Sequence, residues 1–362
     1  MAMAIYNIFL LFLCFCQLGH KITASDEQKT PSHTLQEAYD VLGIKPNPDG
    51  SLTREIRIPM VNATPNVEPT STTQIALSKD IPLNPFTKTF IRLYKPLNPT
   101  KNSKIPLIIY LHGGDFVLFS AKTVIFHEFC NQISAQFPAV VASVEYRLAP
   151  EHRLPAAYDD AMDAIMWARS QAVCGNGSDA WIKQLVDFSH VFLLGSSAGG
   201  NAVYHAALRA LDLNLSPIKI RGMIMNQPYF GGVHRTESEI KLSEDAYIPL
   251  YVNDLLWTFS LPKNANRDHE FCNPLMIGRS YDLGKIKRLP RVMMKGDDGD
   301  PLVDREKMLV KFLEANGVEV VSIFNEGGHH GIELSNTTAA QELYDAMKNF
   351  IHSTLKFKHI NH

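Results

Sequence analysis

Short apolar runs alternate with longer helical patterns through most of the chain. Runs rich in Val, Ile, Leu and Met predict seven strands, at residues 90–94, 107–111, 140–144, 191–194, 222–225, 291–294 and 318–324. Several of these runs are continuously apolar, which is typical of strands buried on both faces of a parallel sheet. Helical patterns lie between them, notably at 156–171, 199–211, 304–316 and 339–355. The alternation predicts an α/β fold with a mostly parallel central sheet flanked by helices.

Two segments depart from this alternation. Residues 26–75 are polar and interrupted by Pro and Gly, with one short helix predicted at 33–42. Residues 231–275 carry charged and aromatic residues without a strand pattern. We interpret this second segment as a helical insertion over the carboxyl edge of the sheet, where open α/β sheets bind ligands.

The beginning of the chain has a different character. Residues 5–16 form an almost wholly apolar run of 12 residues, and small residues follow at 23–25. This length suits a secretory signal and is short for a membrane helix. We expect residues 1–25 to direct the chain into the secretory pathway, and therefore to the exterior, the vacuole or the endoplasmic reticulum. Because no Lys or Arg precedes the run, an uncleaved membrane anchor is the alternative. Four Asn-x-Ser/Thr triplets are compatible with the secretory route: Asn62, Asn176, Asn214 and Asn336.

Composition excludes several function classes. A formal net charge of −2, with 20% charged residues, gives no general electrostatic reason to bind nucleic acid. With only five cysteines, a disulfide scaffold or a multi-cysteine zinc module is a poor interpretation. If the first 25 residues are removed, Cys130, Cys174 and Cys272 remain and permit at most one internal disulfide. The sequence has no phosphate loop, dinucleotide fingerprint or metal-ligand cluster, so we predict no cofactor and no metal.

Ser197 is the candidate nucleophile. It is the central serine of a G-x-S-x-G motif at 195–199. An apolar strand runs directly into the motif and a helix of small residues leaves it, which is the context of a nucleophile elbow. The flanking glycines leave room for a strained turn. A tight Gly-Ser loop without chemical consequence is the alternative interpretation.

Candidate partners follow Ser197 in the order Ser, Asp, His that an α/β-hydrolase uses. Asp300 comes after the strand at 291–294, and His330 comes after the strand at 318–324. His330 would take the proton from Ser197, and Asp300 would fix the imidazole tautomer and stabilise its charged form. Neighbouring residues compete for both roles: Asp297, Asp298, Asp304 and His329. Among these, we interpret Asp304 as a helix N-cap.

A glycine-rich turn supplies candidate oxyanion donors. His112, Gly113, Gly114 and Asp115 follow the strand at 107–111. Such a turn exposes backbone N–H groups, which with the N–H of Ala198 would bind a developing oxyanion. The alternative is a turn that only ends the strand.

These motifs together resemble the hormone-sensitive-lipase-like α/β-hydrolases. His-Gly-Gly precedes the serine elbow, with Tyr-Arg-Leu-Ala-Pro-Glu at 146–151 and Pro-Ala at 155–156 between them. Residues 42–54 (LGIKPNPDGSLTR) and Phe-Ser-Ala at 119–121 resemble the plant carboxylesterase branch. The similarity covers roughly residues 33–355.

The resemblance implies an α/β-hydrolase domain at 76–362 and a site for a small-molecule ester. It implies that Ser197 is the nucleophile, Asp300 the acid and His330 the base. It also implies that the oxyanion donors lie in the turn of Gly113, Gly114 and Asp115 and at Ala198. The lid of this family corresponds here to residues 26–75 and 231–275. Four aromatic residues are candidates for an apolar substrate pocket, with core packing as the alternative: Phe116, Phe119, Tyr229 and Trp257.

Asp115 departs from the family pattern, which usually has a third glycine at this position. The backbone N–H survives, because only Pro lacks it. A carboxylate about 5 Å from the oxyanion, at an effective dielectric of roughly 20, would repel it by about 3 kcal/mol. This repulsion corresponds to around a hundredfold in rate. Asp115 therefore points away, is held protonated, or takes part in chemistry other than simple ester hydrolysis.

Three functions are compatible with these residues. The first is a serine carboxylesterase that acts through an acyl-serine intermediate. The second is a lyase or cyclase of plant specialised metabolism that uses the same pocket with Asp115. The third is a non-catalytic small-molecule receptor similar to the gibberellin receptors, in which the triad is usually broken at the histidine. Because Ser197, Asp300 and His330 are all present, we expect the esterase.

Overall fold

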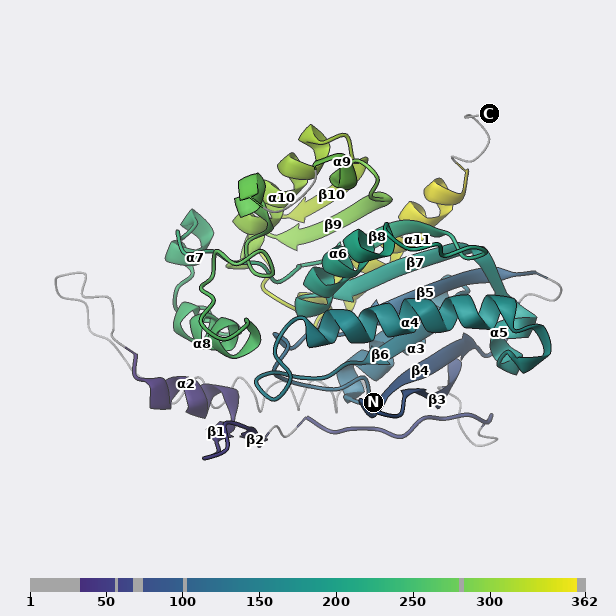
Figure 1. Cartoon of the computed structure of the whole chain (residues 1–362), viewed down its shortest axis with the longest axis horizontal. Coiled ribbons are helices and arrows are strands. Elements are labelled where there is room, and N and C mark those ends of the chain that lie inside the picture. Colours follow the sequence, from purple (N-terminus) through teal and green to yellow (C-terminus); the bar gives the residue numbers. More distant parts are fainter. Residues whose placement is uncertain (1–32, 56–57, 68–73, 100–102, 280–282, 357–362) are drawn as a thin grey trace.

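The computed structural model describes residues 33–55, 58–67, 74–99, 103–279 and 283–356 (Figure 1). The predicted secretory segment at 1–25 lies outside these residues. Within the described residues, no helix is both long and apolar enough to cross a membrane. Cys130, Cys174 and Cys272 are free thiols.

An eight-stranded sheet forms the centre of the molecule, in the order β10-β9-β8-β7-β5-β6-β4-β3. Its strands are β3 (Ala76–Asn84), β4 (Thr89–Pro96), β5 (Ile105–Leu111), β6 (Val140–Glu145), β7 (Val186–Ser196), β8 (Ile220–Asn226), β9 (Arg291–Asp297) and β10 (Val320–Asn325). β4 pairs antiparallel with β3 and with β6, and every other pairing in this sheet is parallel. The prediction of a mostly parallel sheet is confirmed.

Each of the seven predicted apolar runs lies in or overlaps a strand, but β3 was not predicted. It is an edge strand that pairs only with β4. Its first three residues are buried. Beyond them, partly exposed and exposed positions alternate along the strand. Lys79, Asp80 and Pro82 interrupt the apolar pattern, so the sequence of β3 resembles a polar loop.

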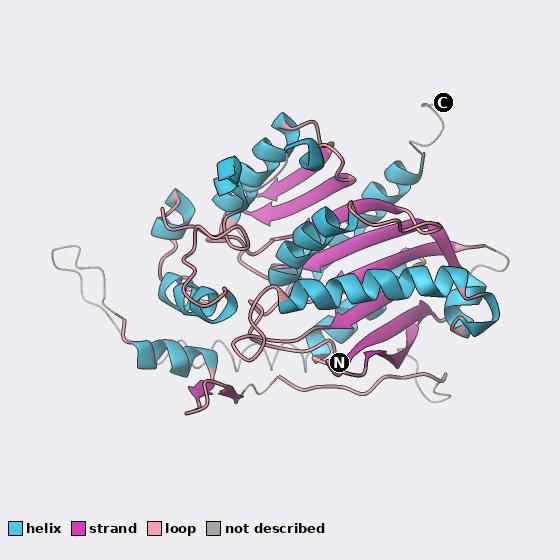
Figure 2. Ribbon diagram, in the orientation of Figure 1, coloured by secondary structure: helices cyan, strands magenta, loops and turns pink. Residues whose placement is uncertain are grey.

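Helices cover both faces of the sheet (Figure 2). One hydrophobic core lies under α4 (Ala156–Val173), α6 (Ala198–Ala210) and α10 (Val303–Ala315). A second core lies under α3 (Val124–Gln136) and α11 (Thr337–Lys356). Successive residues of β5 alternate between these cores: Ile109 belongs to the first, and Ile108 and Tyr110 belong to the second. This alternation is expected of a strand buried on both faces.

The two segments outside the alternating pattern pack against each other. The N-terminal segment contains α2 (Leu35–Leu42), β1 (Ile44–Pro46) and β2 (Leu52–Arg54), and the insertion contains α7 (Glu237–Lys241) and α8 (Leu250–Ser260). They share a third hydrophobic core, made by Ala38, Ile44, Leu52, Val117, Leu118, Ala149, Val252, Leu255 and Leu256. The remaining short helices are η1 (Gly175–Gly177), α5 (Ala180–Leu185), η2 (Pro274–Arg279), α9 (Leu283–Ile286) and η3 (Ile332–Leu334).

Local signals explain where the N-terminal helix lies. Thr34 and Glu37 form a capping box that satisfies the first backbone donors of α2, and Gly43 ends the helix in the left-handed conformation. Arg54 then fastens the segment to the main domain. Its guanidinium donates to the carbonyl of Val117 at 2.6 Å and pairs with the carboxylate of Glu151 at 2.6 Å.

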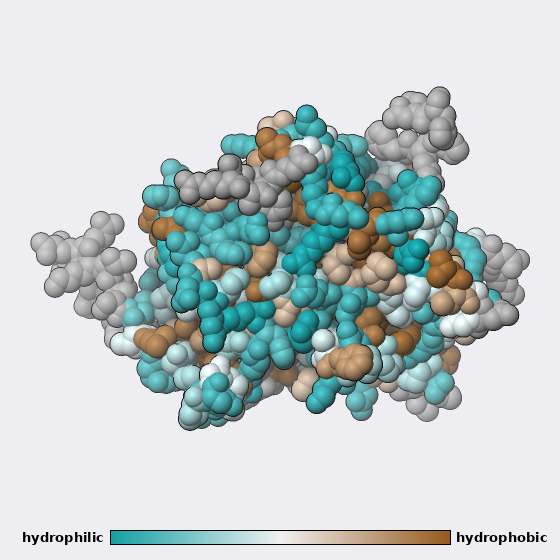
Figure 3. All heavy atoms as spheres, viewed as in Figure 1, coloured by the Kyte–Doolittle hydropathy of each residue, from teal (hydrophilic) through white to brown (hydrophobic). Residues whose placement is uncertain are grey.

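The surface in Figure 3 is mostly hydrophilic, with hydrophobic residues scattered across it.

Candidate active site

Ser197 lies at a sharp turn between β7 and α6. Its backbone has φ 53° and ψ −122°, a conformation that costs energy for a residue with a side chain. The N–H of Ser197 donates to the carbonyl of Asn226 at 2.9 Å, and the carbonyl of Ser197 accepts from the N–H of Tyr229 at 2.9 Å. These two bonds, to the last residue of β8 and to the segment that follows it, hold the strained turn in place. This strand–turn–helix geometry is that of a nucleophile elbow.

The glycines of the motif are required by close backbone approach. A Cβ added at Gly195 would lie 2.1 Å from the carbonyl oxygen of Gly199. A Cβ added at Gly199 would lie 1.8 Å from the carbonyl oxygen of Leu111, at the end of β5. Neither position can hold a side chain unless the backbone moves, which accounts for the G-x-S-x-G pattern in physical terms.

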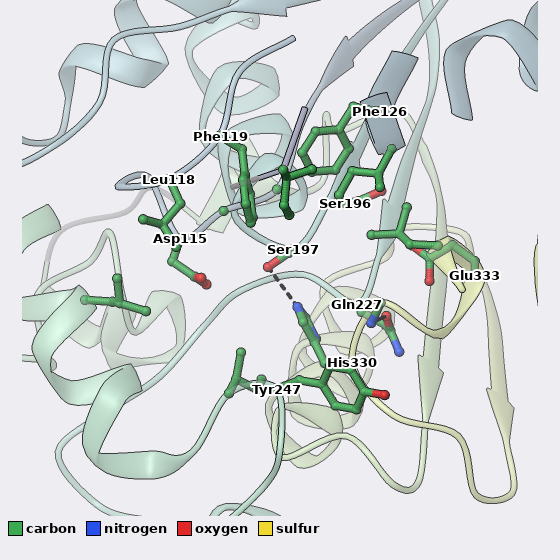
Figure 4. Close-up of a pocket in the computed structure, with 18 of the residues that line it drawn as sticks. Asp115, Leu118, Phe119, Phe126, Ser196, Ser197, Gln227, Tyr247, His330 and Glu333 are labelled. Atoms are coloured by element: carbon green, nitrogen blue, oxygen red, sulfur yellow. Dashed lines mark hydrogen bonds between the residues drawn. The ribbon is translucent and has the colours of Figure 1, made fainter. Parts of the chain in front are cut away.

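Ser197, His330 and Asp300 form one continuous hydrogen-bonded chain. Nε2 of His330 lies 2.9 Å from Oγ of Ser197 (Figure 4). Nδ1 of His330 lies 2.7 Å from Oδ2 of Asp300. Because a carboxylate only accepts, Nδ1 carries a proton and donates it to Asp300. In the neutral imidazole, Nε2 is then free to accept the proton of the serine hydroxyl. Asp300 is fully buried, and its other oxygen accepts from the N–H of Leu302 at 2.9 Å.

The competing acidic residues and His329 have other partners. Asp297 lies at the end of β9 and binds Lys295, Asp298 pairs with Lys307, and the ring of His329 stacks on Tyr247. The interpretation of Asp304 as a helix N-cap is wrong. Helix α10 begins at Val303 with Leu302 as its N-cap, and Asp304 instead accepts the N–H of Ser238 from α7 at 2.8 Å.

Gln227 is a residue that the sequence did not single out. It follows β8, is buried, and has a positive φ of 45°. Its amide nitrogen donates to the carbonyl of His329 at 3.0 Å, and its amide oxygen accepts from the N–H of Gly331 at 2.7 Å. The same nitrogen donates to Asp297 at 2.8 Å. Gln227 therefore binds the backbone on both sides of His330 and ties it to the end of β9. Only the position of Gln227 directly after a buried strand could have drawn attention to it.

The charges around His330 favour its protonated form. Burial alone lowers the pKa of His330, but the charge of Asp300 and its hydrogen bond act in the opposite direction. The negative charges of Asp115 and Glu333 add to this effect, and the pKa of His330 is raised to about 9. Near neutral pH the imidazole is therefore protonated on both ring nitrogens.

The predicted oxyanion turn faces the nucleophile. A Cβ added at Gly113 would lie 3.2 Å from the Cβ of Ser197, and one at Gly114, where φ is 112°, would lie 2.4 Å from the carbonyl oxygen of Leu118. Within the described part of the chain, the N–H groups of Gly114, Asp115 and Ala198 have no hydrogen-bond acceptor. These donors are available to an oxygen atom placed beside Ser197, as an oxyanion hole requires.

His112 and Tyr146 stabilise this turn through ring stacking and hydrogen bonds to its backbone. The ring of His112 stacks on Tyr146 with centroids 4.2 Å apart, and its Nδ1–H donates to the carbonyl of Gly113 at 2.8 Å. The hydroxyl of Tyr146 donates to the carbonyl of His112 at 2.8 Å. Burial lowers the pKa of His112 to about 4, so its ring is neutral and plays a structural part.

Asp115 does not point away from the site. Its side chain points into the cavity beside Ser197 (Figure 4), and the residue is 8% exposed. Its Oδ1 has no hydrogen-bond partner in the described part of the chain. Burial raises the pKa of Asp115, the charge of His330 lowers it, and the charge of Asp300 raises it, with a result of about 6. The first of the three alternatives for Asp115, a side chain turned aside, is not what the structure shows.

The cavity beside Ser197 is mostly apolar. It is lined from the N-terminal segment, the oxyanion turn, α3, the insertion and the His330 loop. Its lining includes Leu42, Leu118, Phe119, Phe126, Tyr247, Ile248, Val252 and Leu256. Of the four aromatic candidates from the sequence, only Phe119 lines it. Phe116, Tyr229 and Trp257 are buried in the core instead, and the Tyr229 and Trp257 rings stack 4.4 Å apart.

No group of three or more His, Cys, Asp or Glu side chains within the described ranges is arranged to hold a metal ion. The chemistry that this arrangement supports is nucleophilic catalysis by a serine hydroxyl, with a histidine base and backbone donors for an oxyanion.

Comparison with known proteins agrees with this chemistry. Residues 108–334 match a family model for the alpha/beta hydrolase fold. A protein of Arabidopsis thaliana named probable carboxylesterase 8 is 44% identical over 88% of this chain and 94% of its own. A 3-O-acetylpapaveroxine carboxylesterase of Papaver somniferum is 42% identical over 88% of this chain and 98% of its own.

Solved structures are similar as well. A hyperthermophilic esterase from Pyrobaculum calidifontis is 26% identical, with a TM-score of 0.63 over 77% of this chain and 86% of its own. The family model, the plant relatives and the fold agree with one another. The chain thus belongs to the α/β-hydrolase family and, within it, to the plant carboxylesterase branch related to hormone-sensitive lipase.

Proposed function

We propose that this protein hydrolyses a small carboxylic ester through an acyl intermediate on Ser197. His330 in its neutral form accepts the hydroxyl proton through Nε2 while Oγ of Ser197 attacks the ester carbonyl carbon. The carbonyl oxygen becomes an oxyanion, which the N–H groups of Gly114, Asp115 and Ala198 stabilise. His330 then gives the proton to the leaving alcohol as the carbon–oxygen bond breaks.

Water completes the cycle. It attacks the acyl-serine carbonyl and gives one proton to Nε2 of His330, which returns it to Oγ of Ser197 as the acid product leaves. Asp300 keeps the imidazole in the required tautomer and stabilises its positive charge in both steps. The step needs no oxidant, reductant or cofactor.

The observation that carries this proposal is the chain of two hydrogen bonds from Ser197 through His330 to Asp300, at 2.9 and 2.7 Å. An intact chain of this kind favours catalysis over a receptor role. The family relationship favours ester hydrolysis over elimination or cyclisation, because the Arabidopsis and Papaver relatives at 44% and 42% identity carry the name carboxylesterase.

We further propose that the acyl group is short. The Papaver relative takes its name from an acetyl ester. In this protein, Phe119 and Phe126 crowd the cavity near the oxyanion turn, with ring centroids 5.9 Å apart. We also propose a role in plant specialised metabolism, which the similarity to the Papaver relative supports.

Hydrolysis of p-nitrophenyl acetate by the purified protein tests the proposal. Ser197→Ala should abolish turnover above the buffer rate. Ser189→Ala, on β7 before the serine turn and outside the cavity, is the matched control and should keep the wild-type turnover. Equal turnover in wild type and Ser197→Ala would contradict the proposal.

We also propose entry into the secretory pathway. The apolar run at 5–16 supports this, as does the exposed side chain of Asn336 in an Asn-x-Thr triplet, whereas Pro65 and Pro217 make the triplets of Asn62 and Asn214 poor acceptors. A carboxyl-terminal fluorescent fusion, imaged and treated with endoglycosidase, tests it. Diffuse cytosolic fluorescence without a shift in gel mobility would contradict it.

A further inference from the structure

The cavity holds a carboxylate, that of Asp115, one oxygen of which has no hydrogen-bond partner among the described residues. This oxygen is Oδ1, and the residue is buried, with only 8% of its surface exposed. The side chain points into the space beside Ser197 (Figure 4). A buried carboxylate without a partner is unfavourable, and proteins normally pair such a group. The missing partner of Asp115 would enter with a ligand.

The positive charge that the described lining of the cavity provides is that of His330. The lining contains no Lys or Arg, and its histidine, His330, is already bonded to Ser197 and Asp300. A second acid, Glu333, lies on the other side of Ser197 in Figure 4. Glu333 differs from Asp115, because it accepts a hydrogen bond from the amide of Asn226 at 2.7 Å. Asp115 is therefore the acid with an oxygen free for a ligand.

The rest of the wall suits an apolar cation. The rings of Phe119, Phe126 and Tyr247 line the cavity with aliphatic side chains. Aromatic faces attract ammonium groups as well as hydrocarbon. An organic ammonium ion would thus find a carboxylate, aromatic faces and apolar contacts in one enclosure.

Building on the ester hydrolysis proposed above, we propose that Asp115 is a specificity-determining residue that binds a protonated amine of the ester substrate. The ammonium N–H donates to the carboxylate of Asp115, and both charges are paired inside the cavity. The same contact explains how the chain tolerates an acid in the oxyanion turn. An ammonium beside Asp115 offsets the repulsion between that carboxylate and the oxyanion, whereas a neutral ester leaves the repulsion in place.

Two pairs of esters of matched shape test the proposal. Dimethylaminoethyl acetate is compared with its carbon isostere isopentyl acetate, and ethyl dimethylaminopropanoate with ethyl isocaproate. The pairs place the amine in the alcohol part and in the acyl part respectively. Wild type should prefer the amine ester of at least one pair by about tenfold to a hundredfold in kcat/KM.

Asp115→Asn keeps the shape and the backbone N–H but removes the charge, and should reduce the preference to about one. The matched control is Asp212→Asn, which removes an exposed carboxylate paired with Lys285 outside the cavity. This control should keep the wild-type preference. Thermal unfolding and labelling of Ser197 by a fluorophosphonate establish that Asp115→Asn is folded.

The outcomes separate this inference from the esterase proposal. If wild type hydrolyses both members of each pair equally, the inference fails and the esterase stands. The same failure follows if Asp115→Asn keeps the preference. If p-nitrophenyl acetate is not hydrolysed, the esterase proposal fails. The inference is then decided by whether the amine ester slows fluorophosphonate labelling of Ser197 more than its isostere does, and whether Asp115→Asn removes the difference.

Discussion

Gln227 binds the peptide groups on both sides of His330. Its side-chain amide donates to the carbonyl of His329 at 3.0 Å and accepts from the N–H of Gly331 at 2.7 Å. Because the imidazole must meet Ser197 at one atom and Asp300 at the other, the loop that carries it has little freedom. Gln227 is therefore a positioning residue for the catalytic base.

Replacing Gln227 with Leu should lower kcat for p-nitrophenyl acetate by up to about a hundredfold, with a small change in KM. A displaced base loses alignment, and a misplacement of about 1 Å can cost this much. Steady-state kinetics with the pH profile of kcat tests this, since a shifted base changes the profile and simple destabilisation does not. Gln341→Leu, on the exposed surface of α11, is the control and should match wild type. An unchanged kcat in Gln227→Leu would refute the positioning role.

Gly199→Ala should destabilise the fold by about 3 kcal/mol or more and abolish activity. The new methyl group would lie 1.8 Å from the carbonyl oxygen of Leu111, so the elbow and β5 must separate. Denaturant unfolding measures the loss. Gly177→Ala is the control, because a Cβ there would lie 3.7 Å from its nearest neighbour, an ordinary contact. Equal free energies of unfolding for Gly199→Ala and Gly177→Ala would show that the backbone close to Gly199 does not prevent a side chain at this position.

The pH profile of kcat/KM should have an acid limb well above the ordinary histidine pKa of about 6.5. His330 acts as a base only after losing its proton, and its pKa is raised to about 9, so activity increases with pH through that range. Asp115→Asn removes one of the negative charges that raise this pKa and should move the limb to lower pH. Asp212→Asn should leave it in place. A limb at or below the ordinary pKa in wild type would show that the imidazole is neutral at rest.

The same shift predicts a pH dependence of stability. A histidine whose pKa is higher in the folded chain than in the unfolded chain stabilises the fold fully below the unfolded value, about 6.5. That contribution is lost as pH increases through about 9. The free energy of unfolding of wild type should therefore fall relative to His330→Gln by up to about 3 kcal/mol across this window. Denaturant titrations of both proteins at several pH values measure the difference, and parallel curves would contradict the raised pKa.

Much of the fold and the nucleophile could be predicted because their causes are local. A continuous apolar run buries both faces of a strand, and Gly195 and Gly199 are needed within two residues of Ser197. The edge strand β3 could not be predicted, because one side of it faces no neighbouring strand and its polar residues resemble a loop. Position after a strand left Asp300 among several acidic neighbours. The family resemblance singled it out, and the hydrogen bond to His330 in the folded loops distinguishes it physically.

Residues whose role depends on contacts across the fold could not be identified from the sequence. Gln227 acts through backbone groups more than a hundred positions away, and an amide side chain carries no characteristic spacing. Phe116 and Trp257 were candidates for the pocket, but the structure packs them in the core, since an aromatic residue has the same pattern in either place. The sequence showed that Asp115 replaces a glycine of the family pattern but not where its side chain lies. Only the structure shows that the side chain faces the cavity.

In the proposed mechanism, Ser197 carries the acyl group during turnover. The most direct measurement is mass spectrometry of peptides from the wild-type enzyme, quenched in acid while it hydrolyses p-nitrophenyl acetate. We expect an acetyl group on Ser197 of the wild type and none on Ser197 when His330 is replaced by Gln. Turnover with the acetyl group on another residue, or with unmodified Ser197 at every quench time, would contradict it.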